Sequence, residues 1–201
     1  MTAPRHDFDE IVRLVSAGAR VLDVGCGEGE LLARLVRDKG VDGRGVEISP
    51  EGVAACLARG LSVMQGDADR DLDYFPAEAF DYVILSQTLQ AVSRPRHVVA
   101  EMLRIGEKAI VTLPNFGHWR VRLDLLRRGR MPVTAALPEP WWATSNIHLC
   151  TLADFTHLCR ELDVRIQASA AFSGNRQARA IDPRGRLENL RAETALFVLS
   201  R

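Results

Sequence analysis

The chain has 201 residues, of which 47% are hydrophobic and 26% are charged. This composition is typical of a globular protein with one domain, expected over residues 1–201, and it excludes disordered, collagenous and coiled-coil proteins. Acidic and basic side chains balance at 26 each, so no net charge attracts the protein to nucleic acid or to a membrane surface.

Helical and extended patterns alternate through the first 115 residues. Apolar spacing, capping residues and closing glycines predict helices at residues 8–18, 28–39, 49–60 and 93–104. Short β-branched or apolar runs predict strands at residues 20–24, 44–48, 61–65, 80–86 and 109–114. This alternation predicts a doubly wound α/β sheet whose strands are mainly parallel and joined by right-handed crossovers.

The alternation stops after Pro114. Residues 115–150 contain all three tryptophans and three prolines, and within them only residues 119–128 are predicted to be helical. We interpret the segment 115–150 as a variable lid or interface added to the sheet.

The C-terminal part returns to regular patterns. Thr151 and Asp154 form an acidic capping box that predicts a helix. Two last strands are predicted near residues 164–172 and 194–200. The stretch 173–193 between them is rich in Arg, Gly and Asn, and is expected to be a mobile connection.

No apolar run approaches the ~18 residues of a membrane-spanning helix, and the N-terminal sequence MTAPRHDFDE lacks the pattern of a secretory signal. The four cysteines are therefore expected to stay reduced, which predicts a cytoplasmic location. The sequence contains no RNA- or DNA-binding motif, so neither nucleic acid nor a membrane is expected as a partner.

The strongest functional signal is the sequence Asp23-Val-Gly25-Cys-Gly27-Glu-Gly29, where the first strand passes into a helix. Glycines let a ligand approach the backbone, and the helix start presents N–H groups to it. The dinucleotide fingerprint G-x-G-x-x-G is not matched, because Glu30 occupies the position of its third glycine. Asp23 disfavours a pyrophosphate and favours a cationic cofactor. S-adenosylmethionine carries an ammonium and a sulfonium but no phosphate, so we predict S-adenosylmethionine or S-adenosylhomocysteine as the ligand.

The ends of the next strands supply matching groups. Glu47 ends the second strand, where a carboxylate can accept both ribose hydroxyls. After the third strand, Asp67 can accept from an adenine amino group while a backbone N–H in the turn with Ala68 meets a ring nitrogen. Gln87 follows the fourth strand and is a candidate for contacting the methionine end of the cofactor or a substrate. Two alternatives stay open: the glycines only form a tight turn beside solvated acids, or the fold has lost cofactor binding.

Four sequences, VLDVGCGEGELL, GVEIS, GDAD and FDYVILSQTLQ, resemble the motifs of class I S-adenosylmethionine-dependent methyltransferases over roughly residues 20–115. This resemblance implies a Rossmann-like sheet of seven strands whose last strand is antiparallel. Further motifs resemble the methionine biosynthesis protein MetW family over nearly the whole chain, namely TLPNFGHWRVRL, GRMP, SNIHLCTLADF and ALFVL. That resemblance implies a role in methionine biosynthesis with homoserine O-acyltransferase as a partner. The Arg-rich stretch 176–191 departs from the family pattern, which leaves partner contacts in that region open.

Methyl transfer to a hydroxyl or carbon nucleophile requires a base, and His118 and His148 are the catalytic candidates. His118 could equally hydrogen-bond a loop carbonyl. No metal site is expected from the pairs His148/Cys150 and His157/Cys159, because residues two apart on a helix point in different directions.

Arginines alternate with Trp119 and with aliphatic residues over positions 119–130. Such a helix is typical of a protein interface or of a lid over a pocket, and a plain solvated helix is the alternative. Three functional hypotheses follow: an accessory protein that acts with homoserine O-acyltransferase, a methyltransferase acting on a small molecule, and a pseudoenzyme that senses S-adenosylmethionine.

Overall fold

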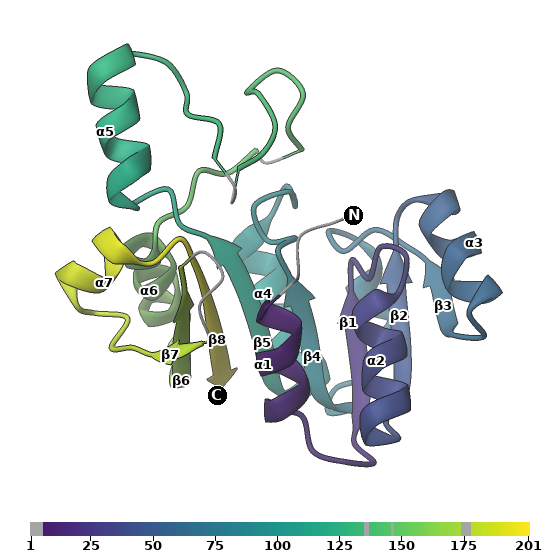
Figure 1. The fold of residues 1–201 in the computed structure, drawn as a ribbon. Helices are drawn as coiled ribbons and strands as arrows, with labels where there is room; N and C mark the ends of the chain where they lie inside the picture. The colour runs from purple at the N-terminus through teal and green to yellow at the C-terminus, as the bar shows by residue number, and fades with distance from the viewer. Residues whose placement is uncertain (1–5, 135–136, 146, 174–177) are drawn as a thin grey trace.

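A computed structural model describes residues 6–134, 137–145, 147–173 and 178–201. It contains one sheet with helices packed on both faces (Figure 1). The strands are β1 (Arg20–Val24), β2 (Asp42–Glu47), β3 (Ser62–Gln65), β4 (Phe80–Ser86), β5 (Gly106–Pro114), β6 (Arg165–Phe172), β7 (Arg179–Ala180) and β8 (Thr194–Ser200). The helices are α1 (His6–Leu14), α2 (Glu30–Lys39), α3 (Pro50–Ala58), the 3-10 helix η1 (Asp71–Tyr74), α4 (Pro95–Ile105), α5 (Trp119–Arg128), α6 (Leu152–Glu161) and α7 (Arg186–Arg191).

The strand order is β3-β2-β1-β4-β5-β8-β6-β7. Strands β1 to β5 pair in parallel, and β8 runs antiparallel to both β5 and β6. The predicted doubly wound sheet with an antiparallel last strand is therefore confirmed. The seven predicted strands correspond to β1–β6 and β8, and the two-residue strand β7 adds an eighth at the edge.

Each face of the sheet has its own apolar core. Ile11 of α1 and Leu35 of α2 pack on one face, together with Val21 of β1. Met102 of α4 and Phe155 of α6 pack on the other face, in a larger cluster. Central strands buried on both faces read as continuous apolar runs, which is why β4 and β5 were visible in the sequence.

Helix starts follow the capping chemistry of the sequence. The Ser49 hydroxyl accepts a hydrogen bond from Gly52 N, with Pro50 at the first helical position of α3. Thr151 and Asp154 form the predicted capping box at the start of α6. Helix α2 begins at Glu30 rather than at residue 28, because Gly27 and Gly29 both hold positive φ angles.

One stretch is more regular than expected. Residues 173–193 were predicted to be a mobile connection, and their described part, 178–193, contains the short elements β7 and α7. The Arg179 Nη1 atom donates to Glu188 Oε1 at 3.0 Å, and Ser169 Oγ donates to Ile181 O at 2.7 Å. These pairs join residues that lie 9 and 12 positions apart, which the local composition could not reveal. Residues 174–177 lie outside the described part of the chain.

The first strands and the helices between them place their connecting loops at one end of the sheet, the carboxyl edge. Helix α5 and the following segment stand above this edge, away from the two helical layers (Figure 1). None of the helices in the described ranges is long and apolar enough to cross a membrane.

Candidate functional site

The glycine loop between β1 and α2 is the first element of the site. Gly25, Gly27 and Gly29 have φ angles of +69°, +55° and +76°, which side chains adopt only with strain. A Cβ added at Gly25 would lie 2.8 Å from the Thr88 side chain, and one at Gly29 would lie 2.5 Å from Leu61. A Cβ at Gly27 would meet nothing within 4 Å. Neighbouring side chains thus pack closely against Gly25 and Gly29, whereas the space beside the Gly27 backbone is open.

Glu47, at the end of β2, is buried with 8% of its surface exposed. Its Oε2 accepts a hydrogen bond from Gly27 N at 2.7 Å, and its Oε1 accepts one from Ser49 N at 2.9 Å. A carboxylate oxygen has two acceptor positions, so each oxygen can take one further donor. Glu47 therefore fixes the glycine loop and still has capacity for two hydroxyl groups.

Asp23 lies beneath the same loop, with 2% of its surface exposed. Burial raises the pKa of the neighbouring Cys26 thiol, and the Asp23 carboxylate raises it further. The Cys26 sulfur lies 3.9 Å from that of Cys56, whose thiol donates to Gly27 O at 3.3 Å. Cys26 is thus a neutral thiol in the packing under the loop.

The turn that holds Asp67 and Ala68 follows β3. Asp67 N donates to Asp71 Oδ2 at 2.7 Å, and Asp67 Oδ1 accepts from Asp69 N at 2.9 Å. Asp69 in turn accepts from the backbone N–H groups of Ser93 and Arg94, both at 2.7 Å. The aspartates fix this turn to the start of α4, and the Asp67 N–H is already used within it.

Gln87, after β4, has a φ angle of +53°, which is uncommon for a residue with a side chain. Its N–H donates to Thr112 Oγ1 at 3.0 Å, and its side-chain amide donates to Asp7 Oδ2 at 3.4 Å. Ser86 Oγ also donates to this Asp7 oxygen at 3.1 Å, and Asp7 is only 4% exposed. Sequence reasoning missed Asp7, although its spacing of four from Ile11 places it on the buried face of α1.

His148 lies beside the loop that follows β4. The backbone N–H groups of Ile147 and His148 both donate to Gln90 O at 2.9 Å, and Gln90 Nε2 donates to Gln87 O at 2.7 Å. The Oε1 atom of Gln90 and the Nε2 atom of His148 are buried without a hydrogen-bond partner in the described part of the chain. Hydrogen bonds of Gln90 therefore connect the backbone of His148 to that of Gln87, in the loop that follows β4.

His118 lies elsewhere, in a cavity of about 50 Å³ beyond the end of β5 that is also lined by Arg120 and Glu193. Burial lowers the pKa of His118, the Glu193 carboxylate opposes this shift, and Arg120 adds to it. Among the described residues, no hydrogen bond links His118 to the glycine loop. Asn115 beside it is 2% exposed and donates to Asn189 O and Ala192 O at 2.8 Å.

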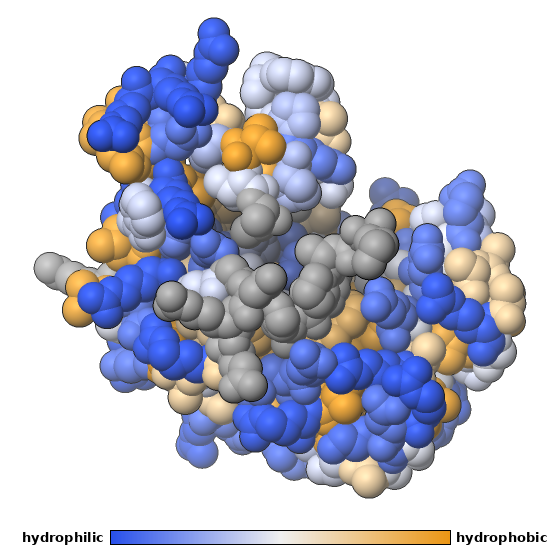
Figure 2. All heavy atoms as spheres, viewed as in Figure 1, coloured by the Kyte–Doolittle hydropathy of each residue, from blue (hydrophilic) through white to orange (hydrophobic). Residues whose placement is uncertain are grey.

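The segment after His118 exposes large apolar side chains. On α5, Trp119 is 44% exposed and Leu126 is 83% exposed. Trp141 and Trp142 are 69% and 73% exposed, with their rings 6.0 Å apart. Figure 2 shows hydrophobic side chains among hydrophilic ones on this part of the surface. The predicted helix is confirmed over Trp119–Arg128, and its exposed face is compatible with either a lid or an interface.

Two cysteines of the pairs that were not expected to bind zinc are neutral thiols in this structure. Burial raises the pKa of Cys150 and that of Cys159 to about 12. The expectation of no metal site at these pairs stays a prediction.

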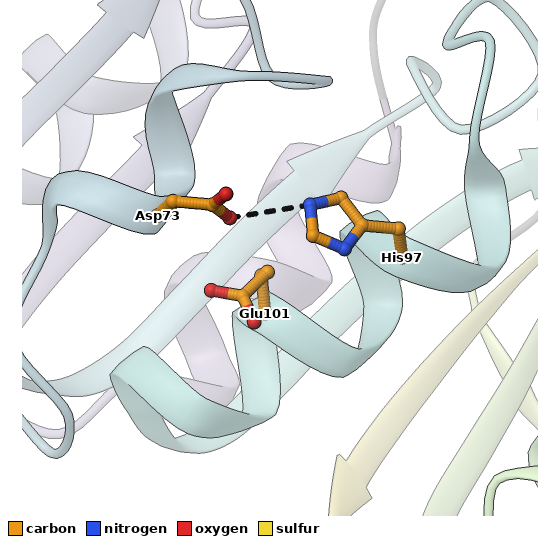
Figure 3. A group of neighbouring side chains, drawn as sticks. All are labelled: Asp73, His97 and Glu101. Atoms are coloured by element: carbon orange, nitrogen blue, oxygen red, sulfur yellow. Dashed lines mark ion pairs between the residues drawn. The ribbon is translucent and has the colours of Figure 1, made fainter.

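Within the described residues, Asp73, His97 and Glu101 place potential metal ligands within 4.8 Å of one another (Figure 3). His97 Nε2 lies 3.2 Å from Asp73 Oδ1. However, Glu101 Oε2 already pairs with Arg104, whose Nη2 and Nε lie 2.6 and 2.7 Å away. Arg104 also donates to Phe75 O at 2.8 Å, so the group joins the end of η1 to α4. The guanidinium group of Arg104 already supplies the positive charge that pairs with Glu101.

Comparison with known proteins shows the family of this chain. Residues 5–199 match the family described as methionine biosynthesis protein MetW. The chain belongs to the MetW family. The bifunctional methionine biosynthesis protein MetXA/MetW of Rhodopirellula baltica is 34% identical over 204 residues, and the match covers 97% of this chain. This chain spans 32% of the length of that relative.

Other relatives are methyltransferases. Ajmaline N-methyltransferase of Rauvolfia serpentina is 26% identical over 175 residues, which cover 83% of this chain and 57% of the relative. The S-adenosylmethionine-dependent methyltransferase structure from Mesorhizobium loti superposes with a TM-score of 0.70, at 18% identity and 98% coverage of both chains. The MetW chain thus has the fold of S-adenosylmethionine-dependent methyltransferases, and a likeness at this identity establishes the fold alone.

Proposed function

We propose that this MetW chain binds S-adenosylmethionine at the carboxyl edge of its sheet and acts in methionine biosynthesis as an accessory partner of homoserine O-acyltransferase. The observation that carries the cofactor part is the pairing of Gly27 with Glu47. Gly27 leaves open space at the backbone, and the buried Glu47 holds the loop in place with acceptor capacity to spare.

The residues of this edge suit the cofactor in chemical type. Glu47 would accept the two ribose hydroxyls. Asp67 would accept from the adenine amino group, and the N–H meeting a ring nitrogen would be that of Ala68, because Asp71 takes the N–H of Asp67. The buried acid Asp23 favours the cationic methionine end, and Gln87 lies at the strand end beyond it. When bound, the cofactor would supply an activated methyl group.

Calorimetry with S-adenosylmethionine tests the cofactor part. The wild-type chain should bind, and Gly27→Val should lose binding because its side chain would fill the open space at the loop. Gly18→Val is the matched control, since Gly18 also has a positive φ angle, +71°, and no atom within 4 Å of an added Cβ. Equal binding by wild type and Gly27→Val would place the cofactor elsewhere. Absence of wild-type binding would refute the cofactor proposal.

The partner part rests on the relative in which MetXA and MetW form one bifunctional protein, and on the resemblance that links this family to homoserine O-acyltransferase. The surface that best suits a protein partner is the exposed apolar and arginine-rich face of α5. Trp119 and Leu126, seven residues apart, lie on one face of that helix.

Co-purification with homoserine O-acyltransferase tests this surface. Trp119→Ala combined with Leu126→Ala should keep S-adenosylmethionine binding and lose the acyltransferase. Leu57→Ala on α3 is the control, because Leu57 is similarly apolar and 57% exposed but belongs to another part of the molecule. A folded double variant that still co-purifies normally would exclude this face. If the wild type fails to associate, the accessory proposal is wrong for this chain.

The second candidate function is methyl transfer to a small molecule. It is favoured by the buried polar atoms of Gln90 and His148 near Gln87, which have no hydrogen-bond partner among the described residues, and by the N-methyltransferase relative. Transfer of labelled methyl groups from S-adenosylmethionine to a small-molecule extract would test it, with His148→Gln expected to reduce the transfer. Binding without transfer, together with a cofactor-dependent change in acyltransferase association, would instead support a sensor.

A further inference from the structure

A hollow of about 610 Å³ lies where α5, α6 and the turn before α7 meet, at the end of the sheet shown in Figure 1. Three arginines line it: Arg122 from α5, Arg160 from α6 and Arg184 from the turn before α7. The other lining residues are Ala153, Thr156, Pro183, Gly185 and Asn189. None of the described residues that line this hollow is acidic.

The three arginines differ from those arginines of the described chain that form ion pairs. Arg13, Arg20 and Arg104, for example, each pair with a carboxylate. Within the described ranges, no carboxylate forms an ion pair with any of the three arginines of the hollow. The chain has no net charge, so the three positive charges that line the hollow are not part of a general basic surface. Like charges that share a site repel, and a bound anion removes that cost.

The frame of the hollow is held by hydrogen bonds. Arg122 Nε donates to Gly117 O at 2.6 Å, which fixes its stem and leaves its two terminal nitrogens to face a ligand. Thr156 Oγ1 donates to Leu152 O at 2.7 Å, and Arg184 N donates to Asp182 Oδ1 at 3.0 Å. The backbone positions that carry the guanidinium groups are thus fixed, although the groups themselves reach into solvent.

We propose that this hollow binds a small molecule that carries a pyrophosphate group. The guanidinium group presents paired N–H donors that match two oxygens of one phosphoryl group. Three such groups match a ligand of about three negative charges better than a single carboxylate or sulfate. The volume lies within the ~300–1,000 Å³ range of small-molecule sites, so the hollow has room for an organic part beyond the phosphates.

This site is independent of the proposed cofactor site, because it uses none of the residues around the glycine loop. It also accounts for the Arg-rich stretch 176–191, which departs from the family pattern. That stretch supplies Arg184, while Arg122 belongs to the arginine-rich helix. The Arg-rich stretch, which the proposed function leaves unexplained, and the arginine-rich helix therefore meet in one hollow.

Calorimetry on the full-length protein at 0.15 M salt, with inorganic pyrophosphate as the probe, tests the proposal. Wild type should bind pyrophosphate more tightly than inorganic phosphate, and Arg160→Ala and Arg184→Ala should each weaken binding about tenfold. Arg122→Lys keeps the charge but removes the paired donors, so it should also weaken binding. Arg127→Ala is the matched control, since Arg127 is an exposed arginine of α5 outside the hollow. Thermal unfolding of each variant confirms its fold.

Four outcomes would overturn the proposal. Wild type that does not bind pyrophosphate at this salt concentration refutes the site. Equal weakening by Arg127→Ala assigns the binding to diffuse charge. Citrate binding as tightly as pyrophosphate, with the same variant pattern, refutes the phosphate class. Loss of acyltransferase association in Arg160→Ala and Arg184→Ala, without any pyrophosphate binding by wild type, would assign the arginines to an acidic protein surface instead. S-adenosylmethionine binding should be unchanged in all of these variants.

Discussion

The glycine-loop end of the sheet and the region beyond β5 satisfy their polar groups in opposite ways. At the glycine loop, the acids accept hydrogen bonds from backbone N–H groups of neighbouring turns, as Glu47 does from Gly27 and Ser49. Beyond β5, arginines and tryptophans extend into solvent, with Trp142 73% exposed. The first region is fixed before any ligand arrives. The second presents large, charged and aromatic side chains at its surface.

The difference separates two kinds of recognition. Preorganised backbone and buried carboxylates suit a small ligand that must be held in one orientation, because little is left to reorganise on binding. Exposed arginines and aromatic residues gain most of their interaction energy on desolvation, as at protein interfaces and around anions. We therefore expect substitutions at the glycine loop to act through geometry, and those beyond β5 to act through lost partners.

The largest effect is expected at Gly29. A valine there would hold a positive φ angle and place its Cβ within 2.8 Å of both Leu61 and Cys56. The strain and overpacking together should lower the free energy of unfolding by about 2–5 kcal/mol. Gly27→Val meets no atom and should cost only about 1–2 kcal/mol. Urea unfolding measures both variants. Equal losses would show that the loop does not divide into packing and ligand-facing glycines.

The glycine-loop region was largely predictable from the sequence because its signals are local. A strand, a glycine turn and a helix follow within 20 residues, and parallel strands bring Glu47 and Asp67 to the same edge. The contacts of Asp7 were not predicted, because those with Ser86 and Thr112 span 79 and 105 positions of the sequence. The roles assigned to the cofactor-site residues remain predictions.

The region beyond β5 was predictable only in part, although helix α5 and the capping box of Thr151 were found. The short elements β7 and α7 were not, since they depend on contacts such as that between Arg179 and Glu188. Asn115 is a further example, because its side chain joins β5 to residues more than 70 positions away. Local composition carries no information about such pairings.

The second prediction concerns Asn115, which holds the region beyond β5 together. Its Nδ2 donates to Asn189 O and Ala192 O, and its Oδ1 accepts from Gly117 N at 2.8 Å. Asn115→Ala leaves these buried groups unpaired and should lower the free energy of unfolding by about 2–3 kcal/mol. Calorimetry should find S-adenosylmethionine affinity unchanged in the folded variant. A matching loss of affinity would mean that the two regions act as one unit.

The third prediction concerns Glu47. Glu47→Ala removes the acceptor proposed for two ribose hydroxyls, and it should weaken S-adenosylmethionine binding by about 1.5–3 kcal/mol. Glu51→Ala is the control, because Glu51 lies four residues later, is exposed and accepts a hydrogen bond from Ser49 Oγ. Calorimetry at equal temperature compares the two variants. Wild-type affinity in Glu47→Ala would remove this residue from the site.

The smallest effect is expected at His118, and it depends on pH. Burial holds the pKa of His118 below its ordinary value of 6.5, so as pH falls through 6.5 the unfolded chain takes up this proton before the folded chain does. Stability contributed by His118 is therefore present above pH 6.5 and is lost as pH falls toward the folded pKa.

Replacing His118 with glutamine should remove this part of the pH dependence. The difference in the free energy of unfolding between wild type and His118→Gln should be largest above pH 6.5 and should shrink at lower pH. His157→Gln, at an exposed position of α6, is the matched control for the substitution itself. Urea unfolding between pH 5 and 8 provides the measurement. A difference that grows as the pH falls would mean that Glu193 outweighs burial, and that His118 is held as a cation in the cavity beyond β5.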